Sequence, residues 1–217
     1  MVLAAGRGER MRPLTDHTPK PLIPVQGKPL LFWHLEALAR AGFREVVINL
    51  AWLGAQIRAA VGDGSRFGLQ VSFSDEGDTA LETGGGIHHA LRWLGDRPFL
   101  VINADTFTDL HFERLVLEEG ALAHLVLVPN PDHHPRGDFA LNEAGFVNLE
   151  GHQRHTYAGY GIYDPQLFAD CVPGRFPLLP LLRKAIAAGR LRGELYRGLW
   201  SDVGTVQRLQ ALELKLG

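Results

Sequence analysis

The stretch LAAGRGERMRPLTDHTPKPL, residues 3–22, carries most of the information about fold and function in this chain. It holds the loop glycines Gly6 and Gly8, three arginines, one lysine and three prolines. The apolar residues 1–5 at its start are typical of a short β-strand. Glycines let a backbone turn sharply and approach an anion closely, and guanidinium groups bind phosphate oxygens through paired hydrogen bonds. A strand–loop junction with this much positive charge therefore predicts a phosphate site.

Other readings of the loop fit less well. A dinucleotide-binding loop, G-x-G-x-x-G, needs a third glycine where Met11 stands, and prolines follow in place of a helix. A Walker A loop is excluded because G-x-x-x-x-G-K-[ST] is absent. A solvated basic turn is the remaining alternative. Against it, Lys20 stands between Pro19 and Pro21, which restrict the backbone and give the lysine a definite direction.

The composition is that of an ordinary globular protein. The chain has 217 residues, of which 46% are hydrophobic and 21% charged, with a net charge of −2. This balance gives no indication of a nucleic-acid or membrane partner. The single cysteine, Cys171, excludes an intrachain disulfide and is expected to pack in the interior. The start is too short for a secretory signal and no run is long enough for a membrane span, so we expect a cytoplasmic enzyme.

The order of the predicted elements indicates the fold class. We expect strands at 1–5, 44–50, 69–74, 98–104 and 121–129, alternating with helices at 30–42, 54–62, 85–95 and 110–120. Later come a hairpin at 138–149 that turns near Glu143–Gly145, a strand at 155–163, and helices at 178–189 and 206–216. This pattern predicts an α/β fold with a mixed, mainly parallel central sheet and helices on both faces. Without repeats or linkers, we expect one domain over 1–217, with a nucleotide-binding half (about 1–110) and a sugar-binding half (about 111–217).

The first motif resembles a family signature. LAAGRGERMRPLT followed by TPKPL is similar to the pattern of the sugar-phosphate nucleotidyltransferases, L-A-[AG]-G-x-G-x-R-[ML]-x-P-L-T and then P-K-[PA]. The resemblance implies a Rossmann-like nucleotide-diphospho-sugar transferase fold. It also implies catalytic roles for Arg10, on the nucleotide phosphates, and Lys20, on the sugar phosphate. The loop residues expected to contact the nucleotide are Ala5, Gly6, Gly8, Glu9 and Arg10.

Two aspartates are candidate metal ligands. Attack on a phosphorus crowded by negative oxygens calls for Mg²⁺, which prefers a few carboxylates together with substrate phosphates. Asp105 ends the apolar run VINADTF (101–107), and Asp202 lies in LWSDVGT (199–205) before a predicted helix. The family has N-G-D-x-[WF] and W-x-D-[VI]-G-T at these places, with Ala104 here in place of the glycine. The alternatives are that Asp105 forms a turn and that Asp202 begins the helix.

The segment ALETGGGIHHAL (80–91) places three glycines at a helix start. Such an end suits an anion or a polar base edge, and the family uses this segment for base and ribose. We expect Glu82, Gly84, Gly85 and, beside Asp105, Asn103 to contact the nucleotide, and Thr83 to position base or sugar. A flexible loop is the alternative.

The segment VPNPDHHPRGDF (128–139) resembles the family's sugar-side loop, in the form typical of short bacterial members that act on N-acetylmuramic acid 1-phosphate. It implies Asn130, Gly137 and Asp138 as sugar contacts, together with Gly161 in YAGYGIY (157–163). Tyr160 departs from the family pattern, and His133 and His134 are read as structural. Either Arg136 or Arg154 is expected to face the lactyl carboxylate of such a sugar.

These resemblances imply a Mg²⁺-dependent reaction of UTP with a sugar 1-phosphate, giving a UDP-sugar and pyrophosphate, in peptidoglycan recycling. An anionic phosphate oxygen attacks directly, so no Ser-His-Asp arrangement is expected. The open alternatives are another acceptor, such as mannose or glucose 1-phosphate or phosphocholine, with GTP, dTTP or CTP, and a non-catalytic nucleotide-sensing subunit. A monomer is plausible, since the sequence leaves no room for a large accessory oligomerisation domain.

Overall fold

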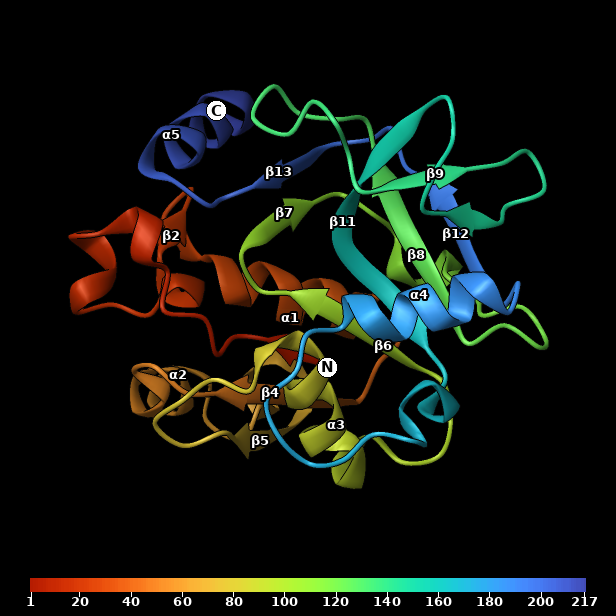
Figure 1. Ribbon diagram of the computed structural model, residues 1–217. Coiled ribbons are helices and arrows are strands. Elements are labelled where there is room, and N and C mark those ends of the chain that lie inside the picture. The colour runs from red at the N-terminus through yellow and green to blue at the C-terminus, as the bar shows by residue number, and fades with distance from the viewer. The chain divides into compact units, whose positions relative to one another are not determined.

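Three strands in the first part of the chain form a parallel sheet (Figure 1). In the computed structural model, which describes residues 1–217, β4 (Glu45–Leu50) pairs in parallel with β1 (Val2–Leu3) and β5 (Gln70–Asp75). Parallel strands need a crossover connection, and α2 (Gly54–Val61) supplies it between β4 and β5. A buried hydrogen bond of 2.7 Å from the Ala4 N–H to Asn49 Oδ1 joins the end of β1 to β4. The glycine loop therefore leaves from the carboxyl edge of this sheet, where α/β proteins bind ligands.

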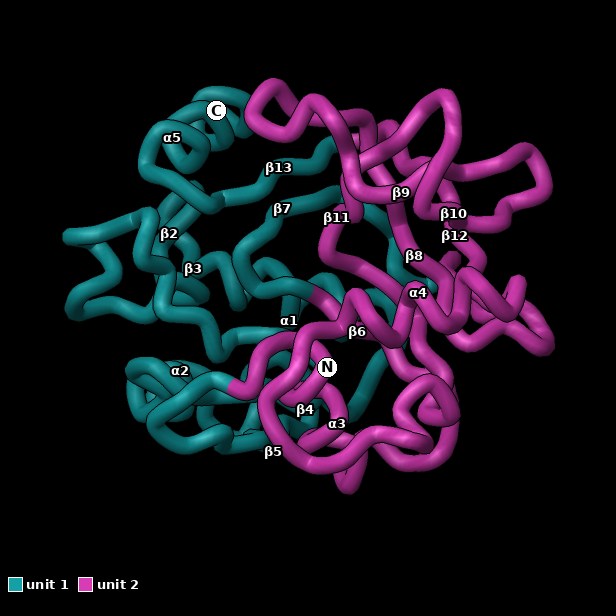
Figure 2. Tube along the Cα trace, viewed as in Figure 1, with its two compact units in different colours: residues 1–80, 103–113, 199–217 teal, residues 81–102, 114–198 magenta.

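The chain divides into two compact units, each made of segments that are distant in sequence (Figure 2). Unit 1 comprises residues 1–80, 103–113 and 199–217, and unit 2 comprises residues 81–102 and 114–198. The glycine loop and the regions of both aspartates thus belong to unit 1. The expected assignment of nucleotide and sugar to successive halves of the chain remains a prediction.

The rest of unit 1 packs around a second apolar cluster. It contains α1 (Leu30–Arg40), α5 (Val206–Leu216), the hairpin of β2 (Pro24–Val25) and β3 (Lys28–Pro29), and the antiparallel pair β7 (Thr106–Thr108) and β13 (Trp200–Asp202). The cluster consists of the buried residues Met11, Ile23, Val25, Leu30, Phe107, Val203 and Leu212. Because these residues come from all three segments of unit 1, burying them holds the segments together.

Unit 2 has a mixed sheet centred on β11 (Arg154–Tyr163). Its antiparallel partners are β6 (Phe99–Asn103, paired through 99–102), β8 (Ala123–Val128) and β9 (Phe139–Leu141). β9 pairs with β10 (Val147–Asn148), and β8 pairs in parallel with β12 (Leu191–Leu195). The helices of the unit are α3 (Glu82–Leu94) and α4 (Leu179–Ala187). The α/β class expected from the sequence is confirmed, with parallel pairing concentrated in unit 1.

Most predicted elements are confirmed, including the hairpin at β9–β10 and the helix over 206–216. The helix expected over 110–120 is wrong, because only a 3-10 turn at Phe112–Arg114 forms there. Phe112 and Leu115 are buried but Val116 is 67% exposed, so the segment has no apolar stripe at helical spacing. The chain also passes from unit 1 to unit 2 between residues 113 and 114. The short strands β2, β3, β7, β12 and β13 were not expected from the sequence.

Candidate active site

The glycine loop is held in a tight turn above Lys20. Gly8 has φ +66°, a left-handed conformation that glycine adopts without strain. Its carbonyl accepts hydrogen bonds from the Met11 N–H at 2.9 Å and from Thr15 Oγ1 at 2.9 Å. A Cβ at Gly8 would lie 2.9 Å from Thr15 Cγ2 and 3.1 Å from Lys20 Cβ. Only glycine therefore lets the loop lie this close to the lysine.

Lys20 is almost completely buried and points at a carboxylate. Its side chain is 8% exposed, and Nζ lies 2.6 Å from Asp105 Oδ2. Pro19 and Pro21 set the backbone of the 3-10 turn Lys20–Leu22, whose Pro19 carbonyl accepts the Leu22 N–H at 2.8 Å. A buried ammonium is unfavourable without a partner, so the ion pair with Asp105 fixes its direction. The structure thus confirms the directed lysine expected between two prolines.

The two candidate metal ligands lie on neighbouring strands. In the antiparallel pair of β7 and β13, Asp202 is opposite Thr106, the residue after Asp105. The Val203 N–H donates to the Asp105 carbonyl at 2.9 Å. This pairing brings together two aspartates that are 97 positions apart (202 − 105) in the sequence. Asp105 does lie in a turn, whereas Asp202 lies on β13 and Thr205, not Asp202, caps α5. The metal-binding role of both aspartates remains a prediction.

Arg10 reaches the same place from the glycine loop. A Cβ built on Gly204 would lie 2.6 Å from Asp202 Oδ1 and 3.0 Å from Arg10 Nη2, and it would overlap the guanidinium of Arg208. Arg208 Nη1 lies 3.0 Å from Asp202 Oδ2. The structure therefore gathers Arg10, Arg208 and Asp202 around Gly204.

The apolar cluster beneath these groups explains why they meet. Met11 follows Arg10, Phe107 lies two residues after Asp105, and Val203 follows Asp202. All three are buried in the same cluster of unit 1. Met11, which stands where a dinucleotide-binding loop would have its third glycine, therefore anchors the loop to the segments that carry the acids.

His34 is a buried polar residue under the site. Its Nε2 lies 2.7 Å from the Thr106 carbonyl. Burial lowers the pKa of His34 to about 4, although the hydrogen bond to Thr106 and the charge of Asp105 act in the opposite direction. The ring is therefore neutral at pH 7, and Nε2–H donates to that carbonyl. This contact fixes the backbone next to Asp105.

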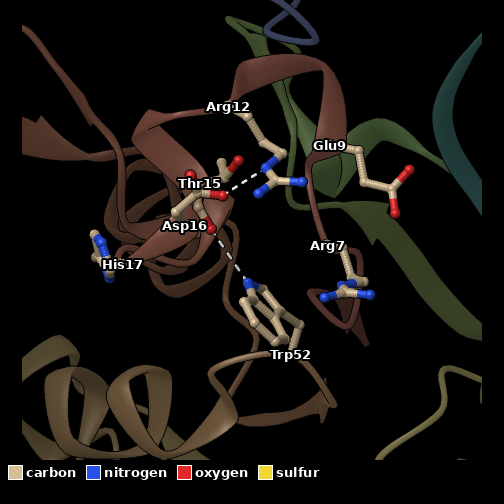
Figure 3. A pocket seen from close by; sticks show the side chains of 7 residues that line it. All are labelled: Arg7, Glu9, Arg12, Thr15, Asp16, His17 and Trp52. Carbon is tan, nitrogen blue, oxygen red and sulfur yellow. Dashed lines mark hydrogen bonds and ion pairs between the residues drawn. The ribbon is translucent and has the colours of Figure 1, made fainter.

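A cavity of about 390 Å³ lies beside the glycine loop (Figure 3). Arg7 stacks over the ring of Trp52, with its guanidinium carbon 4.4 Å from the ring centroid, and Trp52 Nε1 donates to the Thr15 carbonyl at 3.2 Å. Arg12 and Asp16 form an ion pair at 2.6 Å. The cavity is lined by Arg7, Glu9, Arg12, Thr15, Asp16, His17 and Trp52. Glu9 is the one predicted nucleotide contact among these lining residues.

The other predicted nucleotide residues have varied surroundings. In unit 1, Ala5 is buried, Gly6 is exposed, and the Asn103 carbonyl accepts the Thr106 hydroxyl at 2.9 Å. In unit 2, the Glu82 carboxylate pairs with Arg175 Nε at 3.0 Å. The nucleotide-binding roles of these residues remain predictions.

The glycines that begin α3 have a packing role. A Cβ at Gly84 would lie 2.6 Å from the Phe176 ring and 2.8 Å from the Pro177 carbonyl. The Gly85 N–H donates to the Phe176 carbonyl at 3.0 Å, and a Cβ at Gly85 would overlap the Gly174 carbonyl. The helix therefore begins against the segment 174–177 and is not a flexible loop.

The sugar-side residues are joined by hydrogen bonds within unit 2. The Asn130 amide donates to the carbonyls of Pro135 and Arg154 at 3.1 and 2.9 Å, and its Oδ1 accepts the Thr156 hydroxyl at 2.9 Å. Gly137 has φ +59°, and a Cβ there would lie 2.6 Å from Asn130 Oδ1. Asn130 therefore holds the loop in shape, and its contact with a sugar remains a prediction.

Asp138 and Gly161 complete the predicted sugar-side set. Asp138 Oδ2 accepts the Tyr157 N–H at 2.8 Å, and Oδ1 lies 3.0 Å from His134 Nε2. Gly161 lies on β11, where a Cβ would come within 2.9 Å of the His124 carbonyl. Tyr157 and Tyr163 form a hydroxyl–hydroxyl hydrogen bond of 2.8 Å, and burial raises the pKa of Tyr157 to about 12.

The donor set fits a divalent cation that also binds substrate. No group of three or more His, Cys, Asp or Glu side chains is placed to hold a metal by itself. Mg²⁺ is commonly bound through one or two carboxylates plus substrate phosphates. Asp105 and Asp202 offer the two carboxylates. Arg10 and Lys20 beside them suit phosphate oxygens.

Sequence reasoning missed three residues that the structure adds to this region: Arg208, His34 and Trp52. One signal in the sequence could have pointed to Arg208. It is a cation in the first turn of a predicted helix, where the helix dipole favours anions. His34 lay in an apolar helix stripe, and Trp52 lay outside any motif, so neither gave a signal of its own.

Comparison with known proteins places the chain in a family. Residues 1–144 match the family model described as nucleotidyl transferase. N-acetylmuramate alpha-1-phosphate uridylyltransferase of Neisseria meningitidis serogroup B is 50% identical over 225 residues, which cover 100% of this chain and 97% of the relative. The enzyme of the same name from Caulobacter vibrioides is 36% identical, covering 100% and 96%.

Solved structures agree in fold. A putative glucose-1-phosphate thymidylyltransferase from Bacillus anthracis superposes with a TM-score of 0.86 at 20% identity, covering 99% of this chain and 93% of that one. HddC from Yersinia pseudotuberculosis superposes with a TM-score of 0.84 at 23% identity, covering 100% and 98%. None of the helices of this chain is long and apolar enough to cross a membrane. The glycine loop with its arginine and lysine, the two paired aspartates and the full-length relatives lead to one conclusion: this chain is a member of the nucleotidyltransferase family.

Proposed function

We propose that the protein transfers the uridylyl group of UTP to N-acetylmuramic acid 1-phosphate, giving the UDP-sugar and pyrophosphate. The observation that carries the proposal is the convergence of Arg10 and Asp202 around Gly204, beside the pair of Lys20 and Asp105. The choice of substrates follows the names of the two full-length relatives. With these substrates, the enzyme would act in the recycling of cell-wall sugars. We place it in the cytoplasm and expect it to be a monomer.

The reaction is an in-line displacement at the α-phosphorus of UTP. An oxygen of the sugar phosphate forms the new P–O bond, and the bond to the β-phosphate breaks to release pyrophosphate. The nucleophile is already anionic, so no side chain has to remove a proton. Lys20 would orient the attacking phosphate, and Arg10 would neutralise charge that develops on the leaving pyrophosphate.

Asp105 and Asp202 would hold a divalent cation, proposed to be Mg²⁺. When bound, such an ion neutralises phosphate charge and aligns the reacting oxygens. The carboxylates themselves would fix its position relative to Lys20 and Arg10. Since Lys20 lies 2.6 Å from Asp105, the lysine has to share or leave this carboxylate when the ion and substrates bind.

A substrate panel tests the proposal. Pyrophosphate release would be measured for UTP, dTTP, CTP, GTP and ATP, each with N-acetylmuramic acid, N-acetylglucosamine, glucose and mannose 1-phosphates and with phosphocholine. We expect UTP with N-acetylmuramic acid 1-phosphate to give the highest kcat/KM. N-acetylglucosamine 1-phosphate lacks the lactyl carboxylate, so the ratio of kcat/KM for the two sugar phosphates measures the contribution of that carboxylate. A higher value for another pair would replace the proposed substrates, and no release with any pair would contradict enzymatic function.

The lactyl carboxylate calls for a cation on the sugar side. Arg154 begins β11 and donates from Nη2 to the Asp138 carbonyl of the sugar-side loop at 2.6 Å, whereas Arg136 lies in that loop and is exposed. We expect Arg136→Ala or Arg154→Ala to reduce the preference for N-acetylmuramic acid over N-acetylglucosamine 1-phosphate. An unchanged preference in both variants would remove these arginines from carboxylate recognition.

A further inference from the structure

Arg208 occupies an unusual place for a cation. It lies in the first turn of α5, and its N–H donates to Thr205 Oγ1, the N-cap, at 3.3 Å. A helix N-terminus carries a partial positive charge and favours anions, so an arginine there is unfavourable by itself. No acidic residue of the first turn of α5 offsets it. The compensating charge comes from Asp202, on the strand β13 that precedes the helix.

The contact between the two residues is specific and sheltered. Arg208 Nη1 lies 3.0 Å from Asp202 Oδ2, and the two side chains are only 18% and 22% exposed. Arg208 Nε and Nη2 are buried and make no hydrogen bond. Leaving two nitrogens of a buried guanidinium without acceptors is costly. The position is therefore poorly explained by stability alone.

Gly204 lets these charges come together. A Cβ at this position would overlap Arg208 Nη2 and lie 2.6 Å from Asp202 Oδ1 and 3.0 Å from Arg10 Nη2. Oδ2 of Asp202 is thus engaged by Arg208, whereas Oδ1 lies on the Gly204 side, as Arg10 does. The ion pair therefore holds Oδ2 and leaves Oδ1 on the side of Gly204.

We propose that Arg208 is a positioning residue that orients the Asp202 carboxylate for the divalent cation of the nucleotide complex. This inference rests on the proposed function and extends it to a residue outside the motifs. An aspartate on a three-residue strand can rotate its carboxylate, and a second charged group that holds one oxygen leaves the other in a defined direction. Residues that orient metal-binding carboxylates typically contribute 10- to 100-fold, an order-of-magnitude figure, to metal affinity.

The test measures metal binding without turnover. Mn²⁺ would be titrated into the enzyme with a saturating, non-reacting UTP analogue, uridine 5′-(α,β-imido)triphosphate, and free Mn²⁺ followed by electron paramagnetic resonance. We expect Arg208→Met to raise the Mn²⁺ Kd by about 10- to 100-fold. Arg208→Lys keeps the positive charge but lacks the planar guanidinium, so its Mn²⁺ Kd should lie between those of the wild type and Arg208→Met.

A matched control is Arg40→Met, which removes an exposed arginine of unit 1 whose nearest acid, Glu36, is 3.9 Å away. It should bind Mn²⁺ like the wild type. In activity assays, Arg208→Met should raise the Mg²⁺ concentration needed for half-maximal rate while leaving the sugar-phosphate KM near its wild-type value. Circular dichroism of each variant confirms folding, and Arg208→Lys serves as the test if Arg208→Met does not fold.

Asp202→Asn separates the two possible failures. If Asp202→Asn weakens Mn²⁺ binding but the Arg208 variants bind as tightly as the wild type or more tightly, the orienting role is wrong and the metal assignment stands. If Asp202→Asn itself binds Mn²⁺ normally, the proposed metal site is wrong. Tighter binding in Arg208→Met would mean that the arginine only repels the metal.

Discussion

At the scale of single residues, Lys20 is held by both its backbone and its partner. It is almost fully buried, flanked by two prolines, and paired with Asp105 at 2.6 Å. We expect Lys20→Ala to lower kcat/KM by roughly 10- to 150-fold, since a hydrogen bond to a charged group contributes about 1.5–3 kcal/mol. Lys28→Ala is the matched control, because Lys28 pairs with Glu36 at the same 2.6 Å but lies outside the site. Equal effects of the two substitutions on pyrophosphate release would remove Lys20 from the mechanism.

His34 makes the stability of the protein dependent on pH. Its pKa is lowered from 6.5 to about 4 by burial, so between these values the unfolded chain binds more protons than the folded one. The stabilisation is complete above pH 6.5 and is lost as the pH falls towards 4, with a limit of roughly 3 kcal/mol. We expect His34→Gln, which keeps an N–H donor for the Thr106 carbonyl, to show a shallower loss of unfolding free energy from pH 7 to 5 in urea titrations. An equally steep loss would exclude His34 as its source.

The candidate site was partly predictable residue by residue. Arg10, Lys20, Asp105 and Asp202 lie in motifs with ordered spacing, and the structure places them in one unit. Arg208 could not be found in this way, because its role depends on Gly204 lacking a side chain and on the position of Asp202 in space. The motif residues can be recognised from local sequence patterns, whereas the role of Arg208 can be recognised only from tertiary contacts.

At the scale of elements, the start of α3 shows how packing selects residues that also suit a binding loop. Gly84 and Gly85 are expected from the sequence to contact the nucleotide, and the structure shows that both also face the segment 174–177. Sequence gave no sign of this contact, since the partners are about 90 positions away (174 − 84). The wrong helix over 110–120 has the same origin, because the burial of its apolar residues depends on contacts that the local pattern does not contain.

We expect Gly84→Ala to destabilise the protein by about 1–3 kcal/mol, the usual cost of an added group in a filled space. The added methyl would meet the Phe176 ring at 2.6 Å, so Phe176→Ala in the same chain should recover part of the loss. Free energies of unfolding from urea titration of the single and double variants give the coupling between the two positions. Strict additivity would mean that Phe176 does not restrict position 84.

At the scale of the whole molecule, each unit combines segments from distant parts of the sequence. Unit 1 contains both the first and the last residues of the chain, and its apolar cluster joins Met11 to Leu212. The α/β class followed from the alternation of strands and helices, but this grouping could not be derived from composition or periodicity. It explains how motifs at residues 3–22, 101–107 and 199–205 contribute to one constellation.

The most direct test of the account is magnesium-dependent release of pyrophosphate from UTP and N-acetylmuramic acid 1-phosphate by the wild type and by the double variant Asp105→Asn/Asp202→Asn. Both substitutions preserve size and remove the negative charge needed to hold the cation. The account predicts steady release by the wild type, abolished by a chelator, and no release above background by the folded double variant at any Mg²⁺ concentration. Turnover by the double variant at a rate close to that of the wild type would contradict it.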